Sequence, residues 1–191
     1  MEHIITSAIM KHGKRHNILY DLQHGFRDKR SCESQLIGFI DDVVNAIHGG
    51  NQTDVIVMDF SKAFDKESHY LLVEKLSRYG IQGHTNMWIK NWLSDRTQTV
   101  VLEGERSYTA SVRSGVPQGS VLGPCLFLYY INDIPENVQS KVRLFADDTI
   151  VYLAFKDNHK TTSLQSDLDQ LARWESKWKM AFHPKNAKSS A

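Results

Sequence analysis

The stretch RLFADDTIVY, residues 143–152, sets two adjacent aspartates, Asp147 and Asp148, between β-branched and aromatic residues. Because such residues favour strands, we expect a strand, a turn and a second strand over 142–154. Carboxylates inside an apolar strand pattern repel each other and lose hydration, which costs free energy. The pair therefore indicates either a site for shared cations or the polar tip of an ordinary hairpin.

A third carboxylate closes another apolar run. The segment TDVIVMDF (53–60) is rich in valine and isoleucine, so it predicts a buried strand that carries Asp59 near its end. Mg²⁺ prefers oxygen ligands in octahedral geometry, and it usually takes one or two carboxylates together with phosphate oxygens and water. We expect 53–60 to pair antiparallel with the hairpin 142–154, because that arrangement gives Asp59 and the aspartate pair a common cation.

The remaining pattern mixes helices and strands irregularly, which favours an α+β fold with antiparallel strand pairing. A strand pair is expected over 97–113, around a turn near Glu103-Gly104. An amphipathic helix is expected over 161–182, where apolar residues recur at helical spacing. Its apolar positions are Leu164, Leu168, Leu171, Trp174, Trp178 and Phe182. Further helices are expected over 2–12, 31–48, 70–80, 84–94 and 120–134, and the last should be buried because it is apolar nearly all round.

The overall charge neither requires nor excludes a nucleic-acid partner. The 191 residues include 23 basic and 22 acidic side chains, for a net charge of +1, but a neutral protein can still have a positive groove. No apolar stretch approaches the roughly 18 residues of a membrane helix, and the N-terminus lacks the features of a signal peptide. We therefore expect an intracellular protein of the nucleus or cytoplasm with no membrane partner. Cys32 and Cys125 fall in segments expected to be buried helices, which predicts packing rather than a disulfide.

Three motifs in a fixed order carry a family resemblance. A glycine- and proline-rich turn lies between the two carboxylate segments and leads into the apolar helix. The motifs are VIVMDFSKAFD (55–65), SGVPQGSVLGPCLF (114–127) and RLFADDTIVY (143–152). Together they resemble the palm motifs of reverse transcriptases. The particular residues in these motifs are similar to those of non-LTR (LINE-type) retrotransposons. Further segments that resemble this family are LQHGFRDKRSCESQL (22–36), which matches a fingers motif, WLSDRTQTVVLEG (92–104) and WESKWKMAFHPK (174–185).

The resemblance implies a right-hand polymerase fold. Residues 1–191 would form a single partial domain, with an antiparallel sheet packed on helices. Fingers-side helices and a fingers motif would occupy about 1–52, and the palm about 53–191. The family's upstream fingers segment, its thumb and its endonuclease regions have no counterpart in the sequence. The sequence leaves the oligomeric state open.

The resemblance also implies an RNA-directed DNA polymerase, with an RNA template, a DNA primer and dNTPs as partners. Asp59, Asp147 and Asp148 match the catalytic carboxylates. Asp59 and Asp147 would be the main ligands of two Mg²⁺ ions, for which Mn²⁺ could substitute, and Asp148 would support them. The backbone carbonyl of Phe60 would add a ligand to one metal.

Other residues match the family's nucleotide-binding positions. Phe64 matches the position that excludes a 2′-hydroxyl, because an apolar ring under the sugar offers that group neither space nor a hydrogen bond. Gln118 and Gly119 match the motif that lies against the incoming dNTP and the template base. Arg27 matches a residue expected to hold the triphosphate, which suits the bidentate guanidinium. Lys185 matches a lysine with a role in protonating pyrophosphate.

The chain departs from the family at Glu67-Ser68, where members commonly have a small apolar residue and then proline. Because serine is a reasonable helix N-cap, we expect a local change only. Two interpretations stand: a polymerase core, or a truncated, catalytically inactive remnant or nucleic-acid-binding module. An RNA-templated RNA polymerase is disfavoured by Phe64 and by the wording FADD.

Overall fold

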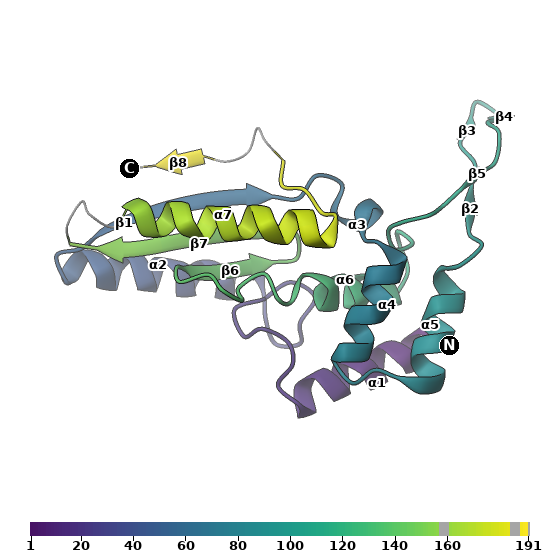
Figure 1. The fold of residues 1–191 in the computed structure, drawn as a ribbon, viewed down its shortest axis with the longest axis horizontal. Coiled ribbons are helices and arrows are strands. Elements are labelled where there is room, and N and C mark those ends of the chain that lie inside the picture. The colour runs from purple at the N-terminus through teal and green to yellow at the C-terminus, as the bar shows by residue number, and fades with distance from the viewer. Residues whose placement is uncertain (157–160, 184–187, 191) are drawn as a thin grey trace.

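The two aspartate segments lie in one antiparallel sheet (Figure 1). The computed structural model describes residues 1–156, 161–183 and 188–190. Within these residues the sheet has four strands in the order β6-β7-β1-β8. Their bounds are Lys141–Phe145 for β6, Asp148–Phe155 for β7, Gln52–Asp59 for β1 and Lys188–Ser190 for β8. The expected pairing of 53–60 with the hairpin 142–154 is confirmed.

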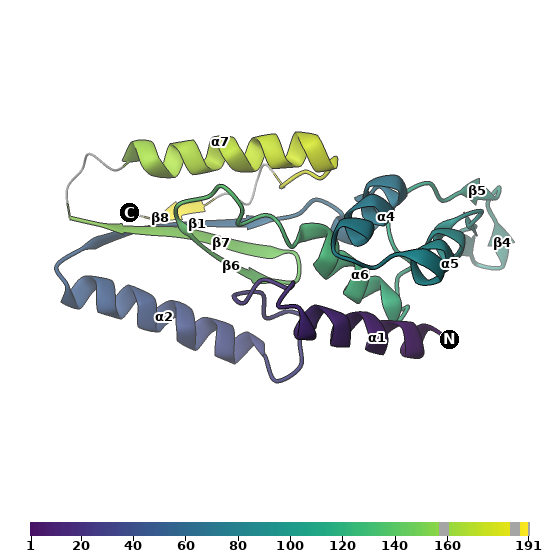
Figure 2. The ribbon, with the colours of Figure 1, turned by 60° about the horizontal axis from the view of Figure 1, so that its bottom comes forward.

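Helices cover both faces of the sheet and gather at one end of it (Figure 2). The amphipathic helix α7 lies over one face, and α2 lies over the other. The helices α1, α4, α5 and α6 form a second group beyond the end of the sheet where β1 stops. The helices are α1 (Glu2–Arg15), α2 (Cys32–His48), α3 (Ala63–Lys66), α4 (His69–Arg78), α5 (Gly83–Leu93), α6 (Leu122–Ile131) and α7 (Thr161–Trp178).

Helix α6 is the centre of the core, as its apolar sequence predicts. Its two tyrosines are fully buried, and each hydroxyl finds a backbone acceptor in another element. The Tyr129 hydroxyl donates to the carbonyl of Ile9 in α1 at 2.8 Å, and the Tyr130 hydroxyl donates to the carbonyl of Trp178 in α7. Because both hydroxyls are hydrogen-bonded, burying them carries little cost. The same two bonds connect α6 to α1 and to α7.

A narrow hairpin arm projects away from the rest of the chain (Figure 1). Its short strands are β2 (Thr97–Gln98), β3 (Val101–Leu102), β4 (Glu105–Arg106) and β5 (Ala110–Ser111). The strands pair β2 with β5 and β3 with β4. Glu103 and Gly104 both have positive φ, at 51° and 87°, which is the conformation of the two-residue turns that close hairpins. The predicted turn at this place is confirmed.

Two predictions about the helices need correction. Helix α7 ends at Trp178, and Lys179 has a φ of 56°, so Phe182 lies beyond the helix rather than on it. Phe182 instead forms a bridge with Phe60 beside the end of β1. Cys32 is exposed, because it is the first residue of α2 and follows the capping residue Ser31, whereas Cys125 is buried as predicted. Both cysteines are free.

None of the helices within the described residues is long and apolar enough to cross a membrane.

Candidate active site

The antiparallel register brings the three aspartates to one end of the sheet. Asp59, the last residue of β1, lies opposite Asp148, the first residue of β7. Asp147 lies beside them, since it and Ala146 form the two-residue turn between β6 and β7. Because that turn interrupts the alternation of a strand, neighbouring aspartates need not point to opposite faces of the sheet.

The electrostatics of this corner are those of crowded carboxylates. Burial raises the pKa of Asp147, and the charge of Asp59 raises it further. Burial also raises the pKa of Asp148, with added repulsion from Asp147 and Asp59. A cation at this end of the sheet would relieve the repulsion and favour all three charged forms.

Within the described residues, no group of three His, Cys, Asp or Glu side chains has the arrangement of a preformed metal site. Mg²⁺ does not need one, because it commonly combines one or two carboxylates with substrate phosphates and water. The donor set of Asp59, Asp147 and Asp148 is made of hard oxygens, which suits this ion. The residues therefore fit a metal that is bound together with its substrate.

A buried glutamine holds the aspartate turn, and the sequence analysis did not single it out. Gln23 is only 3% exposed, and its Oε1 accepts from the backbone N–H of Ala146 at 3.0 Å. Its Nε2 donates to the Ala146 carbonyl at 3.3 Å. Ala146 has a φ of 52°, a conformation that residues other than glycine seldom adopt. Gln23 thus fixes both backbone groups of the residue directly before Asp147.

The segment around Gln23 packs closely on the same turn. The N–H of Gly25 donates to Oε1 of Gln23 at 2.7 Å. A Cβ atom at Gly25 would lie 2.1 Å from the backbone nitrogen of Ala146, so only glycine fits there. Gly25, in the motif QHGFR, was the one sequence signal that could have indicated a close backbone approach.

Arg143, at the start of the quoted motif, is structural. It is 6% exposed, and its guanidinium donates to the Asp42 carboxylate and to the Gly38 carbonyl of α2. Its Nε also donates to the Tyr152 hydroxyl at 2.7 Å. Burial opposes the charge of Asp42, but hydrogen bonds from Lys141, Tyr152 and Arg143 lower its pKa to about 2. This network fixes α2 against β6 and β7.

The two phenylalanines after β1 have different surroundings. Phe60 is 3% exposed, and its ring stacks on Phe182 with centroids 4.3 Å apart. Phe64 is half-buried, with its ring 4.5 Å from Phe127 and 6.1 Å from Phe26, centroid to centroid. Phe64 therefore packs on the core with part of its surface and leaves the rest accessible.

The glycine- and proline-rich loop is fastened to the chain just after β1. The N–H of Val116 donates to the Phe64 carbonyl and that of Gly115 to the Glu67 carbonyl, both at 2.8 Å. Gly115 has a φ of 79°, and a Cβ there would lie 2.5 Å from the Phe64 carbonyl oxygen. These contacts bring Phe64 and the exposed Gln118 into the lining of one cleft of about 590 Å³.

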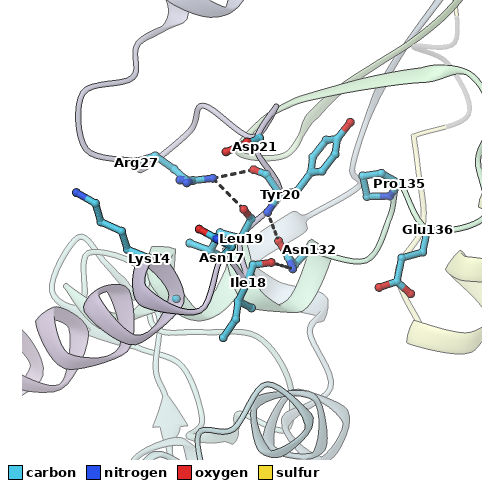
Figure 3. Close-up of a pocket in the computed structure, with 11 residues that line it drawn as sticks. Lys14, Asn17, Ile18, Leu19, Tyr20, Asp21, Arg27, Asn132, Pro135 and Glu136 are labelled. Atoms are coloured by element: carbon cyan, nitrogen blue, oxygen red, sulfur yellow. Dashed lines mark hydrogen bonds between the residues drawn. The ribbon is translucent and has the colours of Figure 1, made fainter.

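The other predicted nucleotide-binding residues are less closely grouped. Gly119 has a φ of 75° in the turn before α6. The Nη1 of Arg27 donates to the carbonyl of Tyr20 at 2.7 Å, in a pocket of about 640 Å³ (Figure 3). Its guanidinium is thus hydrogen-bonded to the backbone of the preceding loop. Contact between Arg27 and a triphosphate stays a prediction. Lys185 lies outside the described residues.

Glu67, the departure from the family pattern, is fully buried. Both of its carboxylate oxygens lack a hydrogen-bond partner within the described residues. Burial raises its pKa to about 8, and the charge of Asp65 adds to the effect. Ser68 is the N-cap residue of α4 as expected, but its side chain makes no capping hydrogen bond.

Sequence and structure comparisons agree on the family. Residues 1–190 match the family model described as reverse transcriptase (RNA-dependent DNA polymerase). The chain is 27% identical to the probable RNA-directed DNA polymerase from transposon BS of Drosophila melanogaster, and 28% identical to that from mobile element jockey of the same species. Each alignment covers 96% of this chain but 21% of the relative, so the chain spans about a fifth of their length.

Solved telomerases share the fold at low sequence identity. A telomerase from Candida albicans, in complex with a fragment of telomeric RNA, superposes with a TM-score of 0.72 over 98% of this chain and 35% of its own, at 10% identity. Apo telomerase from Candida tropicalis gives 0.70 over 99% of this chain and 36% of its own, at 9% identity. The non-LTR retrotransposon resemblance of the motifs is confirmed by the curated relatives. This chain belongs to the reverse transcriptase (RNA-dependent DNA polymerase) family.

Proposed function

We propose that this chain is the catalytic core of a non-LTR retrotransposon RNA-directed DNA polymerase, which extends a DNA primer on an RNA template. The observation that carries the proposal is the register of β1 and β7, which sets Asp59 opposite Asp148 with Asp147 in the adjoining turn. In this proposal residues from about 53 onward form the palm, and about 1–52 contribute fingers-side helices. The reaction would take place inside the cell, in the nucleus or cytoplasm.

The chemistry is attack of a primer 3′-hydroxyl on the α-phosphate of a dNTP, with pyrophosphate as the leaving group. Asp59 and Asp147 would hold two Mg²⁺ ions, supported by Asp148 and by the Phe60 carbonyl, and Mn²⁺ could take their place. When bound, such ions activate the hydroxyl and neutralise charge on the leaving oxygens. The protein's own task is positioning, since phosphoryl transfer needs little covalent assistance.

The surrounding residues would select and orient the nucleotide. The accessible part of the Phe64 ring would lie against the sugar, where it disfavours a 2′-hydroxyl. Gln118 and Gly119 would contact the incoming nucleotide and the template base from the loop that is fastened to Phe64. Arg27 would reach the triphosphate by exchanging its backbone acceptor for a phosphate oxygen. Lys185 would serve the leaving pyrophosphate.

Primer extension on poly(rA)/oligo(dT) with Mg²⁺ tests this function. We expect the chain, joined to the flanking polymerase segments of a relative, to incorporate dTTP, and Asp147→Asn to abolish incorporation. The melting temperature of Asp147→Asn without metal should equal or exceed that of the original protein, because a crowded charge is removed. Asp54→Asn, on the same strand β1 but away from its catalytic end, is the matched control and should retain extension. Incorporation by the Asp147→Asn variant would contradict the proposal.

The inactive remnant is the less favoured interpretation, because the three aspartates and the strand register that joins them are all retained.

A further inference from the structure

The loop 114–118 is held in place by the chain that joins β1 to α4. The N–H of Gly115 donates to the Glu67 carbonyl at 2.8 Å, and the bond from Val116 described above lies next to it. Gln118 belongs to the same short loop and lines the cleft of about 590 Å³. The position of Gln118 therefore depends on where the backbone around Glu67 lies.

Two side-chain hydrogen bonds complete this attachment, one before and one after Glu67 in the sequence. The Ser114 hydroxyl donates to the Asp65 carbonyl at 2.8 Å. Nε2 of His69 donates to the Gly115 carbonyl at 2.7 Å. Glu67 thus stands in the middle of the segment that fastens the loop.

The side chain of Glu67 is unusual for such a place. It is 0% exposed, and neither carboxylate oxygen has a hydrogen-bond partner within the described residues. A buried carboxylate without a donor or a cation is costly, and the neutral acid costs much less. Burial raises the pKa of Glu67 to about 8, and the N–H of the same residue opposes this rise only in part. The fastened arrangement therefore holds Glu67 in its protonated form.

The charged and titratable groups around Glu67 do not offer it a counterion. Asp65, in α3, repels its charge and raises its pKa further. On the side of α6, burial and the charge of Glu67 both raise the pKa of Tyr130, to about 12. Lys75, the buried cation of α4, is paired with Asp133 instead. An ionised Glu67 therefore reaches water only if the segment 64–69 moves.

We propose that Glu67 is a proton-dependent positioning residue, which holds the loop 114–118 in place while it is protonated and releases the loop when it loses the proton to solvent. The inference rests on the proposed function for its consequence, because there Gln118 lies against the incoming nucleotide. Release of the loop displaces Gln118 and lowers the affinity for dNTP. The three aspartates lie at the end of the sheet, outside the lining of this cleft.

The direction of the pH dependence follows from the two states of the loop. The fastened state keeps the proton up to about pH 8, whereas a released Glu67 in water returns to its ordinary value of 4.5. Between these values, each rise of one pH unit favours release by up to about tenfold. Above about pH 8 the released state predominates.

Hydrogen exchange of the Gly115 and Val116 amides measures release in the chain without any nucleotide. We expect their protection factors, which correct for the intrinsic rate, to fall by up to about tenfold for each unit between about pH 6 and about pH 8. Low urea should leave this exchange unchanged, because a local opening exposes little surface. The buried amide of Leu144, bonded to the Leu22 carbonyl at 2.9 Å, should be better protected and sensitive to urea.

Two substitutions at the same position isolate the proton. Glu67→Gln keeps the size of the side chain but cannot ionise, and Glu67→Val replaces it with an apolar residue that needs no partner. Both should give protection factors at Gly115 and Val116 that do not change over this pH range. Glu105→Gln, on the exposed hairpin arm, is the matched control and should keep the pH dependence of the original protein.

The second measurement is KM for dTTP in the protein joined to the flanking segments of a relative. Between about pH 7 and about pH 9, KM of the original protein should rise about tenfold relative to KM of Glu67→Val, because only the fastened fraction binds nucleotide. The ratio of the two kcat values should change much less. A residue with a purely structural role would lower stability without this separation of KM from kcat.

Protection factors at Gly115 and Val116 that stay constant with pH in the original protein would overturn the inference. So would an equal fall in Glu67→Val, or a ratio of KM values that does not change with pH. Incorporation of dTTP at about pH 7 tests the proposed function separately. Incorporation together with constant protection factors rejects the role of Glu67 alone, whereas pH-dependent release without incorporation rejects the proposed function.

Discussion

The ring of Phe64 packs on Phe127 and also lines the cleft that contains Gln118. We expect Phe64→Val to raise incorporation of UTP relative to dTTP by at least about tenfold. A ring that excludes the 2′-hydroxyl leaves it without a partner, and an unpartnered polar group costs about 1–3 kcal/mol. The measurement is kcat/KM for both nucleotides on one primer–template.

The control for this variant is Phe39→Val. Phe39 packs on Tyr152 with ring centroids 5.1 Å apart, away from the nucleotide cleft. Its loss should lower the melting temperature without changing the ratio of UTP to dTTP use. An unchanged ratio in Phe64→Val as well would assign Phe64 to core packing alone.

The side chain of Gln23 bonds to the backbone of Ala146, so it would act on the site through the turn that carries Asp147. We expect Gln23→Met to reduce kcat strongly while KM for the dNTP changes little, because the turn that carries Asp147 loses both of its side-chain hydrogen bonds. Gln35→Met is the matched control. Gln35 is buried to a similar degree and bonds the carbonyls of Leu22 and Leu144, and none of its hydrogen bonds within the described residues goes to Ala146.

Gln23→Met should lose stability by about 1–3 kcal/mol, since it leaves the backbone N–H of Ala146 without its partner. Gln35→Met also removes buried hydrogen bonds, but the carbonyls of Leu22 and Leu144 keep their backbone donors, so its loss should be smaller. Comparing the two therefore separates stability from catalysis. If kcat falls equally in both variants, the hydrogen bonds between Gln23 and Ala146 have no specific role in the reaction.

Glu67 should make the stability of the protein depend on pH. Its pKa is about 8 in the folded chain, against an ordinary value of 4.5. Between these values the unfolded chain has lost the proton that the folded chain retains, so the free energy of unfolding falls as pH rises. The fall is at most about 1.4 kcal/mol for each pH unit, and it ends above about pH 8.

Urea unfolding at about pH 5.5, about pH 6.5 and about pH 7.5 measures this fall in the free energy of unfolding, because all three values lie inside that window. Glu67→Gln should flatten the dependence, and Glu105→Gln, on the exposed hairpin arm, should leave it in place. A profile as steep in Glu67→Gln as in the original protein would show that another group titrates.

At the scale of elements, a buried ion pair ties α4, α6 and α7 together. The ammonium of Lys75 lies 2.6 Å from Oδ1 of Asp133 and 3.5 Å from the centroid of a Trp178 ring. Trp174 donates to the same Asp133 oxygen at 2.7 Å. Burial lowers the pKa of Lys75 to about 8, although Asp133 favours its charged form.

We expect Asp133→Asn to destabilise the protein by about 3–5 kcal/mol, because it leaves a buried ammonium without its counterion. Adding Lys75→Met should recover part of the loss, with a coupling above about 1 kcal/mol in a double-mutant cycle. The exposed pair Glu74–Arg78 on the same helix is the control, and its coupling should stay below about 0.5 kcal/mol. Equal couplings for the two pairs would contradict this account of Lys75.

Local patterns predicted most of the elements. Apolar and β-branched runs around Asp59 and the aspartate pair predicted the strands, because strand burial depends on neighbouring residues. Their pairing was predicted from the need of the three carboxylates for a common cation. The end of α7 was misplaced, since the apolar spacing of Phe182 continues that of the helix although the chain turns at Lys179. Spacing alone does not show whether an apolar residue reaches the core from a helix or from the segment after it.

Polar contacts between distant segments could not be predicted in the same way. Gln23 and Ala146 are 123 positions apart, and Arg143 and Asp42 are 101 apart. No periodicity relates such residues, and a glutamine in a loop ordinarily reads as a solvated side chain. The family resemblance indicated Asp59, Asp147 and Asp148 as candidate site residues, but it gave no indication of the residues that hold their turn.

At the scale of the whole molecule, charge is arranged locally. The net charge of +1 conceals three crowded aspartates at the end of β1 and, elsewhere, a cleft lined by Lys62, Lys66, Arg96 and Arg113. Opposite charges gathered at different places on one chain cancel in the net charge but give different local potentials. The composition of the whole chain therefore gives no indication of these local charges.

The hydrogen bonds between Gln23 and Ala146 have a consequence for the order in which the chain folds. Joining residues 123 positions apart requires closure of a long loop, which is slow compared with helix formation. Helices α1 and α2 can begin to form from local contacts while the chain is being synthesised. The turn of Ala146 and Asp147 can form only after both β6 and β7 have been synthesised. The end of the sheet that carries the three aspartates therefore becomes ordered only after the chain has been synthesised past Asp148.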